Sequence, residues 1–210
     1  SRAILADGWA GVRVIDIEDA DHPREIGRVN TPGDALSALL HEGTTWVADS
    51  SGALLAIDAD AAGSARIAHS VALPSPPASL AALTGAVLVA GGDSLVLVID
   101  DAVADVAEIR CDIVASHGAE TALVGGQSRI TLVEHQASRL VIRSSLDMGG
   151  EVTALSMTQQ LGLVGVGQRL AVVDLREPDA LSLVATLDAP AQINTFVVDG
   201  ALAFAGVGNR

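Results

Sequence analysis

The chain has 210 residues, a net charge of −14 at pH 7 and apolar residues at 50% of its positions. This composition excludes a disordered chain, because it supplies the apolar side chains that a packed core needs. The negative charge argues against nucleic acid as a partner, since a phosphate backbone would be repelled. No apolar run reaches the length that a membrane-spanning helix requires.

Strand-forming runs alternate with turn residues from the start of the chain. The first strand ends at Asp7-Gly8, where glycine permits a tight turn. The run 12–17, Val-Arg-Val-Ile-Asp-Ile, is rich in β-branched residues and predicts a second strand. Asp21-His22-Pro23 interrupts the pairing, because proline has no N–H to donate. A third strand at 26–29 then leads into turn residues at 30–33.

The run LADGWAGVRVIDIEDADHPREIGRVNTPGDA at residues 5–35 resembles an LVIVD repeat. In that family a strand ending Ala-Asp-Gly, a strand reading Leu-x-Val-Ile-Asp and a Thr-Pro-Gly turn recur with a period of about forty residues. A second copy keeps Val47-Ala48-Asp49 and Ala56-Ile57-Asp58 but lacks the Thr-Pro-Gly turn. The resemblance implies β-propeller blades of an exported or cell-surface protein, and it implies no catalytic constellation.

Acidic residues that close strands give the length of the repeat. Asp16, Asp58 and Asp100 stand 42 residues apart, and later units place the same position at Arg143 and Asp174, so that one unit is shorter. A period near 42 with four strand-like runs is typical of a propeller blade. The expected units of the single propeller domain are 1–43, 44–85, 86–126, 127–159 and 160–200, with 201–210 as a surplus or closing strand.

We therefore predict an all-β fold, most simply a β-propeller of five four-stranded blades. The ring would close if the strand at Gln192–Asp199 joined the first blade. The strand Leu202–Val207 would then be surplus, and an unpaired apolar strand can pair with another chain. An incomplete six-bladed ring, or part of a longer propeller, remains an alternative.

Motifs for catalysis, cofactors and metals are absent from the sequence. It contains no Ser-centred elbow, no histidine pair at metal spacing and no Cys-x-x-Cys, and without lysine it cannot form a Walker loop. The run Asp58-Ala59-Asp60 begins like a calcium loop, but Ala62 replaces the third acid. The acidic run from Asp16 to Asp21 is expected to be a solvated loop, and Cys111 a packed thiol. No catalytic, cofactor-binding or metal-binding residue is predicted.

Two groups of residues are candidate sites. A polar residue recurs six positions before the end of each expected innermost strand, which would place a ring around the central channel: Ser37, Ser79, Glu120, Thr153 and Asn194. Such a ring could bind water, an ion or a ligand group, or it could hydrogen-bond neighbouring blades together. The loops on one face of the disc give a candidate binding face, with an aromatic anchor: Trp9, Asn30, Thr31, Asp34, His117, Glu151 and Gln192.

These observations favour a non-catalytic binding or scaffold module that mediates protein–protein interaction in an extracellular or cell-surface setting. One alternative is an enzyme with an axial carboxylate site, of glycan hydrolase or lactonase type, for which Glu120, Asp34 and Glu151 are the available acids. Another is a structural subunit that joins a larger assembly through the strand Leu202–Val207. Neither nucleic acid nor a membrane-spanning segment is expected.

Overall fold

The computed structural model describes residues 2–60, 64–200 and 202–208. Over these ranges the chain forms 21 strands and no helix. It follows that the described residues include no helix with the length and hydropathy to cross a membrane.

The strands pair antiparallel in six sheets, which we number 1 to 6 in chain order. Sheet 1 contains β1 (Arg2–Ala6), β2 (Val12–Asp16) and β3 (Arg24–Val29), and sheet 2 contains β4 (Ala35–His41), β5 (Thr44–Asp49), β6 (Ala53–Ala59) and β7 (Ala65–Ala72). Sheet 3 contains β8 (Ser79–Leu83), β9 (Ala86–Gly91), β10 (Ser94–Ile99) and β11 (Ala102–Ala107), and sheet 4 contains β12 (Ile113–His117), β13 (Thr121–Gly126), β14 (Arg129–Gln136) and β15 (Arg139–Asp147). Sheet 5 contains β16 (Val152–Met157), β17 (Leu161–Val166), β18 (Arg169–Asp174) and β19 (Ser182–Asp188), and sheet 6 contains β20 (Ile193–Asp199) and β21 (Leu202–Val207).

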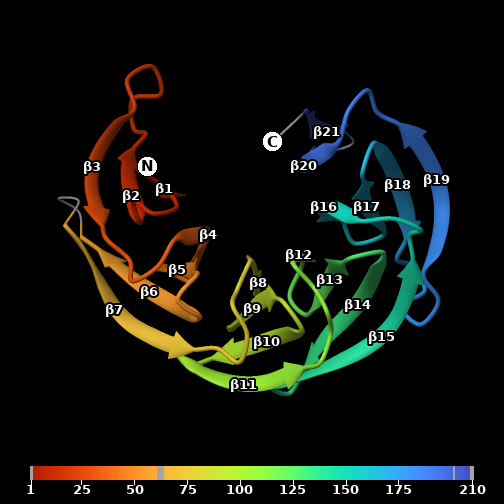
Figure 1. Ribbon diagram of the computed structural model, residues 1–210, viewed down its shortest axis with the longest axis horizontal. Helices are drawn as coiled ribbons and strands as arrows, with labels where there is room; N and C mark the ends of the chain where they lie inside the picture. Colours follow the sequence, from red (N-terminus) through yellow and green to blue (C-terminus); the bar gives the residue numbers. More distant parts are fainter. Residues whose placement is uncertain (1, 61–63, 201, 209–210) are drawn as a thin grey trace.

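The six sheets stand side by side along an open arc, like the blades of a propeller (Figure 1). The first strand of each of sheets 2 to 6 lies nearest the centre of the arc, and the following strands lead outward (Figure 1). The innermost strands of neighbouring sheets contact one another, as β16 does with β20 and with β12. The predicted all-β propeller architecture is therefore confirmed.

The prediction that the ring closes through sheet 1 is wrong. Among the described residues β20 pairs with β21 and not with β1, so the strand expected at Gln192–Asp199 opens a sixth sheet. Leu202–Val207 is its hairpin partner instead of a surplus strand. The open arc of six sheets agrees with the alternative of an incomplete ring or part of a longer propeller. The local hairpin pairing of β20 with β21 takes the place of a long-range pairing of β20 with β1.

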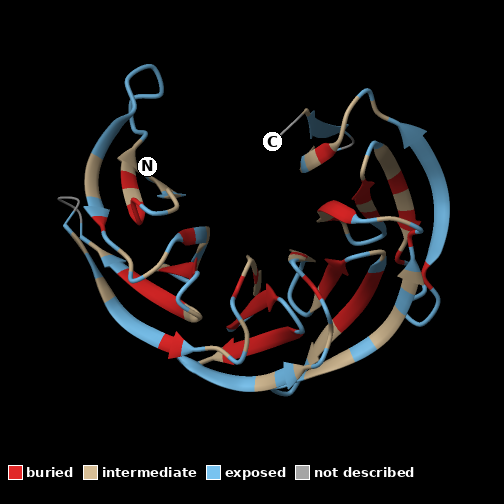
Figure 2. Ribbon diagram, viewed as in Figure 1, coloured by how far each residue is buried: buried red, intermediate tan, exposed pale blue. Residues whose placement is uncertain are grey.

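The core lies between the sheets and is richest in the two middle strands of the four-stranded sheets 2 to 5 (Figure 2). β9 is buried at every residue, whereas the outermost strand β19 is exposed at every residue. Small aliphatic side chains fill these layers, such as Leu88, Leu95 and Val124 between sheets 3 and 4. A middle strand is covered on both faces, which explains its nearly continuous apolar sequence.

Sheets 3 and 4 differ from the others in the connection between their two outer strands. β10 joins β11 through Asp100 and Asp101, and β14 joins β15 through Ala137 and Ser138. All four residues have positive φ, between 46° and 69°, as in a two-residue type I′ hairpin turn. These short turns replace the longer loops of sheets 1, 2 and 5.

The short hairpins correct part of the predicted repeat. Arg143 does not close a third strand but lies inside the outermost strand β15. The expected unit 86–126 contains five strands, and 127–159 contains three. The repeat is shorter than expected in this part of the chain because two-residue turns join the outer strands of sheets 3 and 4, and not because a single stretch has been deleted.

Candidate functional site

One face of the arc carries the turns between the second and third strands and the loops that join successive sheets. We call it the loop face, and it comprises residues 7–11, 30–34, 50–52, 73–78, 92–93, 108–112, 127–128, 148–151, 167–168 and 189–192.

Backbone hydrogen bonds hold each connecting loop against a turn of the preceding sheet. The N–H of Met148 donates to the carbonyl of Ser128, and that of Val152 donates to Gln127, both at 2.6 Å. Ala189 and Ile193 repeat the pattern one sheet later, with carbonyls of residues 168 and 167 at 2.7 and 2.8 Å. Loops fastened at both ends offer a preformed surface, which reduces the entropic cost of binding.

Three adjoining hollows form a groove on the loop face over sheets 3 to 5. Their volumes are about 440, 680 and 370 Å³ in chain order. The first two share the lining residues Gln127 and Ser128, and the last two share Glu151, so the three hollows adjoin one another. We call this feature the loop groove.

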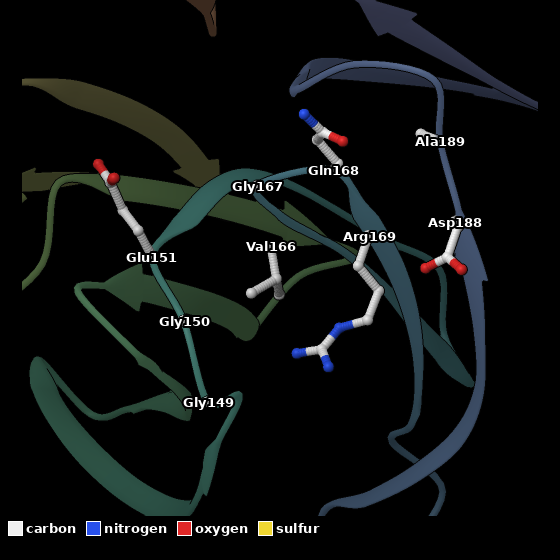
Figure 3. Close-up of a pocket in the computed structure, with 9 residues that line it drawn as sticks. All are labelled: Gly149, Gly150, Glu151, Val166, Gly167, Gln168, Arg169, Asp188 and Ala189. Atoms are coloured by element: carbon white, nitrogen blue, oxygen red, sulfur yellow. The ribbon is translucent and has the colours of Figure 1, made fainter.

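The hollow at the end of the loop groove is built around Arg169 (Figure 3). Its guanidinium Nη2 donates to the carbonyl of Met148 at 2.5 Å, which ties β18 to the loop 148–151. Its Nε is buried and has no hydrogen-bond acceptor among the described residues. Asp188 and Glu151 line the same hollow from either side (Figure 3).

The loop groove carries charges of both signs. Arg110, Arg129 and Arg169 contribute positive charge, and Glu108, Asp112, Glu151 and Asp188 contribute negative charge. Arg110 approaches Asp93 at 3.5 Å, in a pair that is mostly exposed. Together with exposed amide side chains such as Gln127, these groups favour hydrogen bonding and ion pairing over enclosure of a small apolar ligand.

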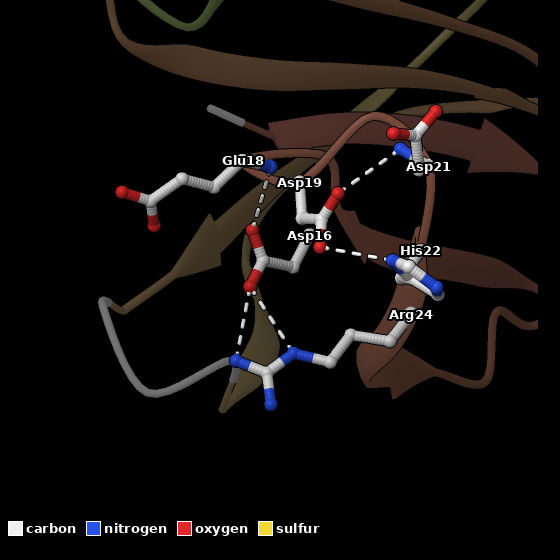
Figure 4. A network of polar contacts seen from close by, with 6 residues as sticks. All are labelled: Asp16, Glu18, Asp19, Asp21, His22 and Arg24. Atoms are coloured by element: carbon white, nitrogen blue, oxygen red, sulfur yellow. Dashed lines mark hydrogen bonds and ion pairs between the residues drawn. The ribbon is translucent and has the colours of Figure 1, made fainter.

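Metal chemistry receives no support from the described part of the chain, where no group of three His, Cys, Asp or Glu is placed to hold an ion. The acidic loop of sheet 1 is internally hydrogen-bonded instead (Figure 4). Asp16 accepts from the Glu18 N–H and from Arg24, and these contacts lower the pKa of Asp16. Asp19 accepts from the Asp21 N–H and contacts His22. The calcium-like run beginning at Asp58 continues into residues 61–63, which lie outside the described residues.

Most of the predicted binding face is on the loop face but far along the arc from the loop groove. Trp9 is 89% exposed in the turn of sheet 1. Asn30, Thr31 and Asp34 lie in the loop between sheets 1 and 2, and Gln192 lies between sheets 5 and 6. Glu151 is the member of this set that lines the groove.

The placement of His117 on that face is wrong. His117 ends the innermost strand β12, where the chain turns toward β13, and this turn is on the opposite face. The error follows from the hairpin at Asp100 and Asp101, which brings the outermost strand of sheet 3 to Ala102–Ala107 and the innermost strand of sheet 4 to Ile113–His117.

The predicted ring is formed only in part. Ser37, Ser79, Thr153 and Asn194 lie on the innermost strands β4, β8, β16 and β20. Glu120 does not: it is exposed in the turn after β12, so its inclusion in a channel site is wrong.

Three of the predicted ring residues on the innermost strands form hydrogen bonds with neighbouring strands or sheets. The Ser79 hydroxyl accepts from the Val114 N–H of the next sheet at 3.3 Å. Buried Thr153 donates to the carbonyl of Ile193 in the next sheet at 2.6 Å. Asn194 donates to Gly208 at 2.9 Å within its own sheet. These contacts give the ring residues a structural role at the boundaries between sheets.

The sequence analysis missed most of the loop groove. A signal was present, because Arg129 and Arg169 both begin the third strand of a sheet directly after a two-residue turn, Gln127-Ser128 and Gly167-Gln168. Gln127 and Gly167 both have positive φ, 48° and 57°, so the pair marks equivalent turns.

The comparisons with known proteins agree with this architecture. A crystal structure described as a functionally unknown protein from Desulfotomaculum acetoxidans DSM 771 matches with a TM-score of 0.84 and 11% identity, over 99% of this chain and 73% of that one. The WD40 beta propeller domain of Doa1 matches with a TM-score of 0.74 and 11% identity, over 94% of this chain and 69% of the other. No family model and no curated protein matches the sequence. The chain thus has a β-propeller fold, and between a quarter and a third of each neighbour extends beyond the match.

Proposed function

We propose that this protein is a non-catalytic interaction module that binds an extended segment of a partner protein along the loop groove. The observation that supports it is the succession of three adjoining hollows, which share Gln127, Ser128 and Glu151, on loops fastened by backbone hydrogen bonds. A segment lying there would meet amide, hydroxyl and charged groups from sheets 3, 4 and 5 in turn. The resemblance of residues 5–35 to an LVIVD repeat supports an exported or cell-surface setting.

Arginine side chains would contribute much of the specificity. Arg129 is exposed at the start of β14 and lines the first hollow, where a carboxylate of the partner could accept two parallel hydrogen bonds from its guanidinium. Such a contact weakens with salt, because the pair is solvent-exposed. We therefore expect partner segments that contain acidic residues.

Selection from a displayed random peptide library against the 210-residue chain tests this function. Enriched peptides should bind with affinities that fall about tenfold in Arg129→Ala, equivalent to about 1.4 kcal/mol. Arg139→Ala is the matched control, since Arg139 is also exposed and also begins a strand of sheet 4, but follows the turn on the opposite face. Failure to enrich any peptide, or equal effects of both substitutions, would refute the proposal.

A second candidate is a hydrolase with a carboxylate pair. Asp112 and Glu151 line the same 680 Å³ hollow, and two acids in one hollow are what acid–base hydrolysis requires. Turnover of a panel of glycans or lactones that is lost in both Asp112→Asn and Glu151→Gln would support this alternative over the binding module.

A further inference from the structure

The first hollow of the loop groove lies at the boundary of sheets 3 and 4. Its volume is about 440 Å³, and its residues come from the loop 108–112, the turn 127–128 and the strands β13, β14 and β15. Both sheets have four strands, and each has a further sheet on its other side (Figure 1). The hollow therefore belongs to the middle of the arc and not to one of its ends.

The loops that enter sheets 3 and 4 approach the turns of those sheets in the same way. Gly91 and Gly126 each end the second strand of their sheet. A Cβ on Gly91 would lie 2.7 Å from the Cα of Pro77, and a Cβ on Gly126 would lie 2.7 Å from the Cα of Cys111. The two loops can therefore be compared residue by residue.

In sheet 3 a hydrogen bond between two hydroxyls fills the place that the hollow takes in sheet 4. Ser75 stands two residues before Pro77, and its hydroxyl bonds the hydroxyl of Ser94, the first residue of β10. The corresponding residues in sheet 4 are Ile109 and Arg129, the first residue of β14. Isoleucine has no hydroxyl to make this bond, and both residues line the hollow instead.

Thr131 brings a hydroxyl into a layer that is apolar at the same position of other sheets. It is the third residue of β14, and the third residues of the corresponding strands in sheets 2, 3 and 5 are buried and aliphatic: Leu55, Val96 and Ala171. Thr131 is 5% exposed and lines the hollow, and its Oγ1 lies 2.9 Å from the Oγ of Ser145 on β15. A bond between two hydroxyls uses one of their two hydrogens, so the pair keeps a donor and acceptors for a further group.

Aliphatic side chains surround this hydroxyl pair. Ile109 lines the hollow from the entering loop, Val124 from β13 and Ile142 from β15. Ile142 is 54% exposed, so part of this apolar lining is open to water. Hydroxyls set among aliphatic side chains suit a group with an apolar body and a polar tip.

We propose that the first hollow binds a tyrosine side chain of the partner segment, an inference that rests on the proposed function. The ring packs on Ile109 and Ile142, and the phenolic hydroxyl exchanges a hydrogen bond with Thr131 and Ser145. Phenylalanine would cover the same aliphatic side chains but would leave the hydroxyl pair without a partner. The acidic residue that pairs with Arg129 then lies next to the tyrosine in the partner's sequence.

Titration of the isotope-labelled 210-residue chain with N-acetyl-tyrosine amide tests this site without any selected peptide. Amide signals of residues 109, 131 and 142 in NMR spectra should shift at ligand concentrations up to about 10 mM. N-acetyl-phenylalanine amide should bind about fivefold more weakly, because it lacks the hydroxyl.

Thr131→Val separates the hydroxyl from the shape of the hollow. Valine stands at the corresponding position of β10, so this layer accommodates it. The variant should lose the about fivefold preference for the tyrosine amide and should bind the phenylalanine amide like the wild type. Thr45→Val is the matched control, since Thr45 is also 5% exposed but lies on β5, outside the loop groove, and this variant should keep the preference.

Three results would overturn the proposal. They are no binding of the tyrosine amide, shifts confined to signals outside the hollow, and a tyrosine preference that Thr131→Val leaves unchanged. Each of them is compatible with library peptides whose binding depends on Arg129, in which case the proposed function stands and the tyrosine site fails. If the library yields no peptide while the tyrosine amide binds with the expected preference, the tyrosine site stands and the proposed function fails.

Discussion

The buried carboxylate of Asp49 accepts a hydrogen bond from the backbone N–H of Gly33, with the nitrogen 2.9 Å from Oδ1. Asp49 ends β5 in sheet 2, whereas Gly33 belongs to the loop that arrives from sheet 1. The same oxygen accepts from the Ser51 N–H at 2.9 Å. A Cβ on Gly33 would stand 2.8 Å from that oxygen, so the close approach depends on glycine. A side chain thus fastens this loop to sheet 2, in addition to the backbone hydrogen bonds between Ala35 and Gly8 of sheet 1.

Replacing Asp49 should therefore destabilise the protein. Asp49→Ala leaves two N–H groups of a tightly packed turn without an acceptor, and we expect a loss of about 2 kcal/mol in the free energy of unfolding. Urea unfolding followed by circular dichroism measures this loss. Asp93→Ala is the control, because Asp93 is in the equivalent turn of sheet 3 but is exposed. Equal losses in the two variants would contradict the role of Asp49.

Gly126 provides a test of how closely loops approach turns in sheet 4. A Cβ at this position would lie 2.3 Å from the carbonyl oxygen of Arg110, a backbone atom that can move only with its loop. Gly126→Ala should cost about 1–3 kcal/mol through overpacking and should also reduce peptide binding in the loop groove. Gly85→Ala would meet no atom within 4 Å, although φ is +66° there, so it reports backbone strain alone. A stability equal to wild type in Gly126→Ala would contradict the close approach.

The propeller class was predictable from the sequence because its signals are local and repeated. Strands with β-branched residues, turn glycines and a 42-residue period define blades without any tertiary information. Ring closure was not predictable, since it depends on whether β20 pairs with β21 or with β1. The hairpins at Asp100 and Ala137 were missed because a type I′ turn normally favours Asn or Gly, and Asp-Asp and Ala-Ser give a weak signal.

The candidate site was harder to predict than the fold. Glu151 was predicted as a binding-face residue and lines the loop groove. The predicted positions of His117 and Glu120 were wrong, because the strand assignment was shifted after residue 100. The loop groove depends on side chains from three sheets, and a single sequence does not show which turns become neighbours. The arginine that follows each of the equivalent turns 127–128 and 167–168 would have been the most useful clue.

Thr153 should contribute to stability through its bond between sheets 5 and 6. Thr153→Val keeps the shape but removes the donor to the Ile193 carbonyl, with an expected loss of about 1 kcal/mol. Thr153→Ser retains the hydroxyl and should recover part of that loss.

Glu120→Gln should change the unfolding free energy by less than about 0.5 kcal/mol, because Glu120 is exposed in a turn. Thermal unfolding of the three variants distinguishes these outcomes, and a large effect at Glu120 would restore it as a candidate channel residue.

Cys111 should be unreactive in the folded protein. It is fully buried, its thiol lies 3.4 Å from the Ser94 carbonyl, and burial raises the pKa of Cys111 to about 12. The thiolate is the reactive form, so a disulfide reagent at pH 8 should label the native chain far more slowly than the chain in guanidinium chloride. Rapid labelling of one thiol per native chain would show that the loop 108–112 opens.

Stability should fall in strong acid through Asp174. The Arg176 side chain and backbone N–H hydrogen-bond its carboxylate and lower the pKa of Asp174 from 3.8 to about 2. Because the folded-state pKa is the lower one, this contribution is present above pH 3.8 and is lost as the pH falls through about 2. Asp174→Asn should therefore be less stable than wild type at pH 5, and the difference should shrink toward pH 2. Arg176→Gln should show the same convergence, whereas a difference that stays constant down to pH 2 would mean that the ion pair is not the source of the effect.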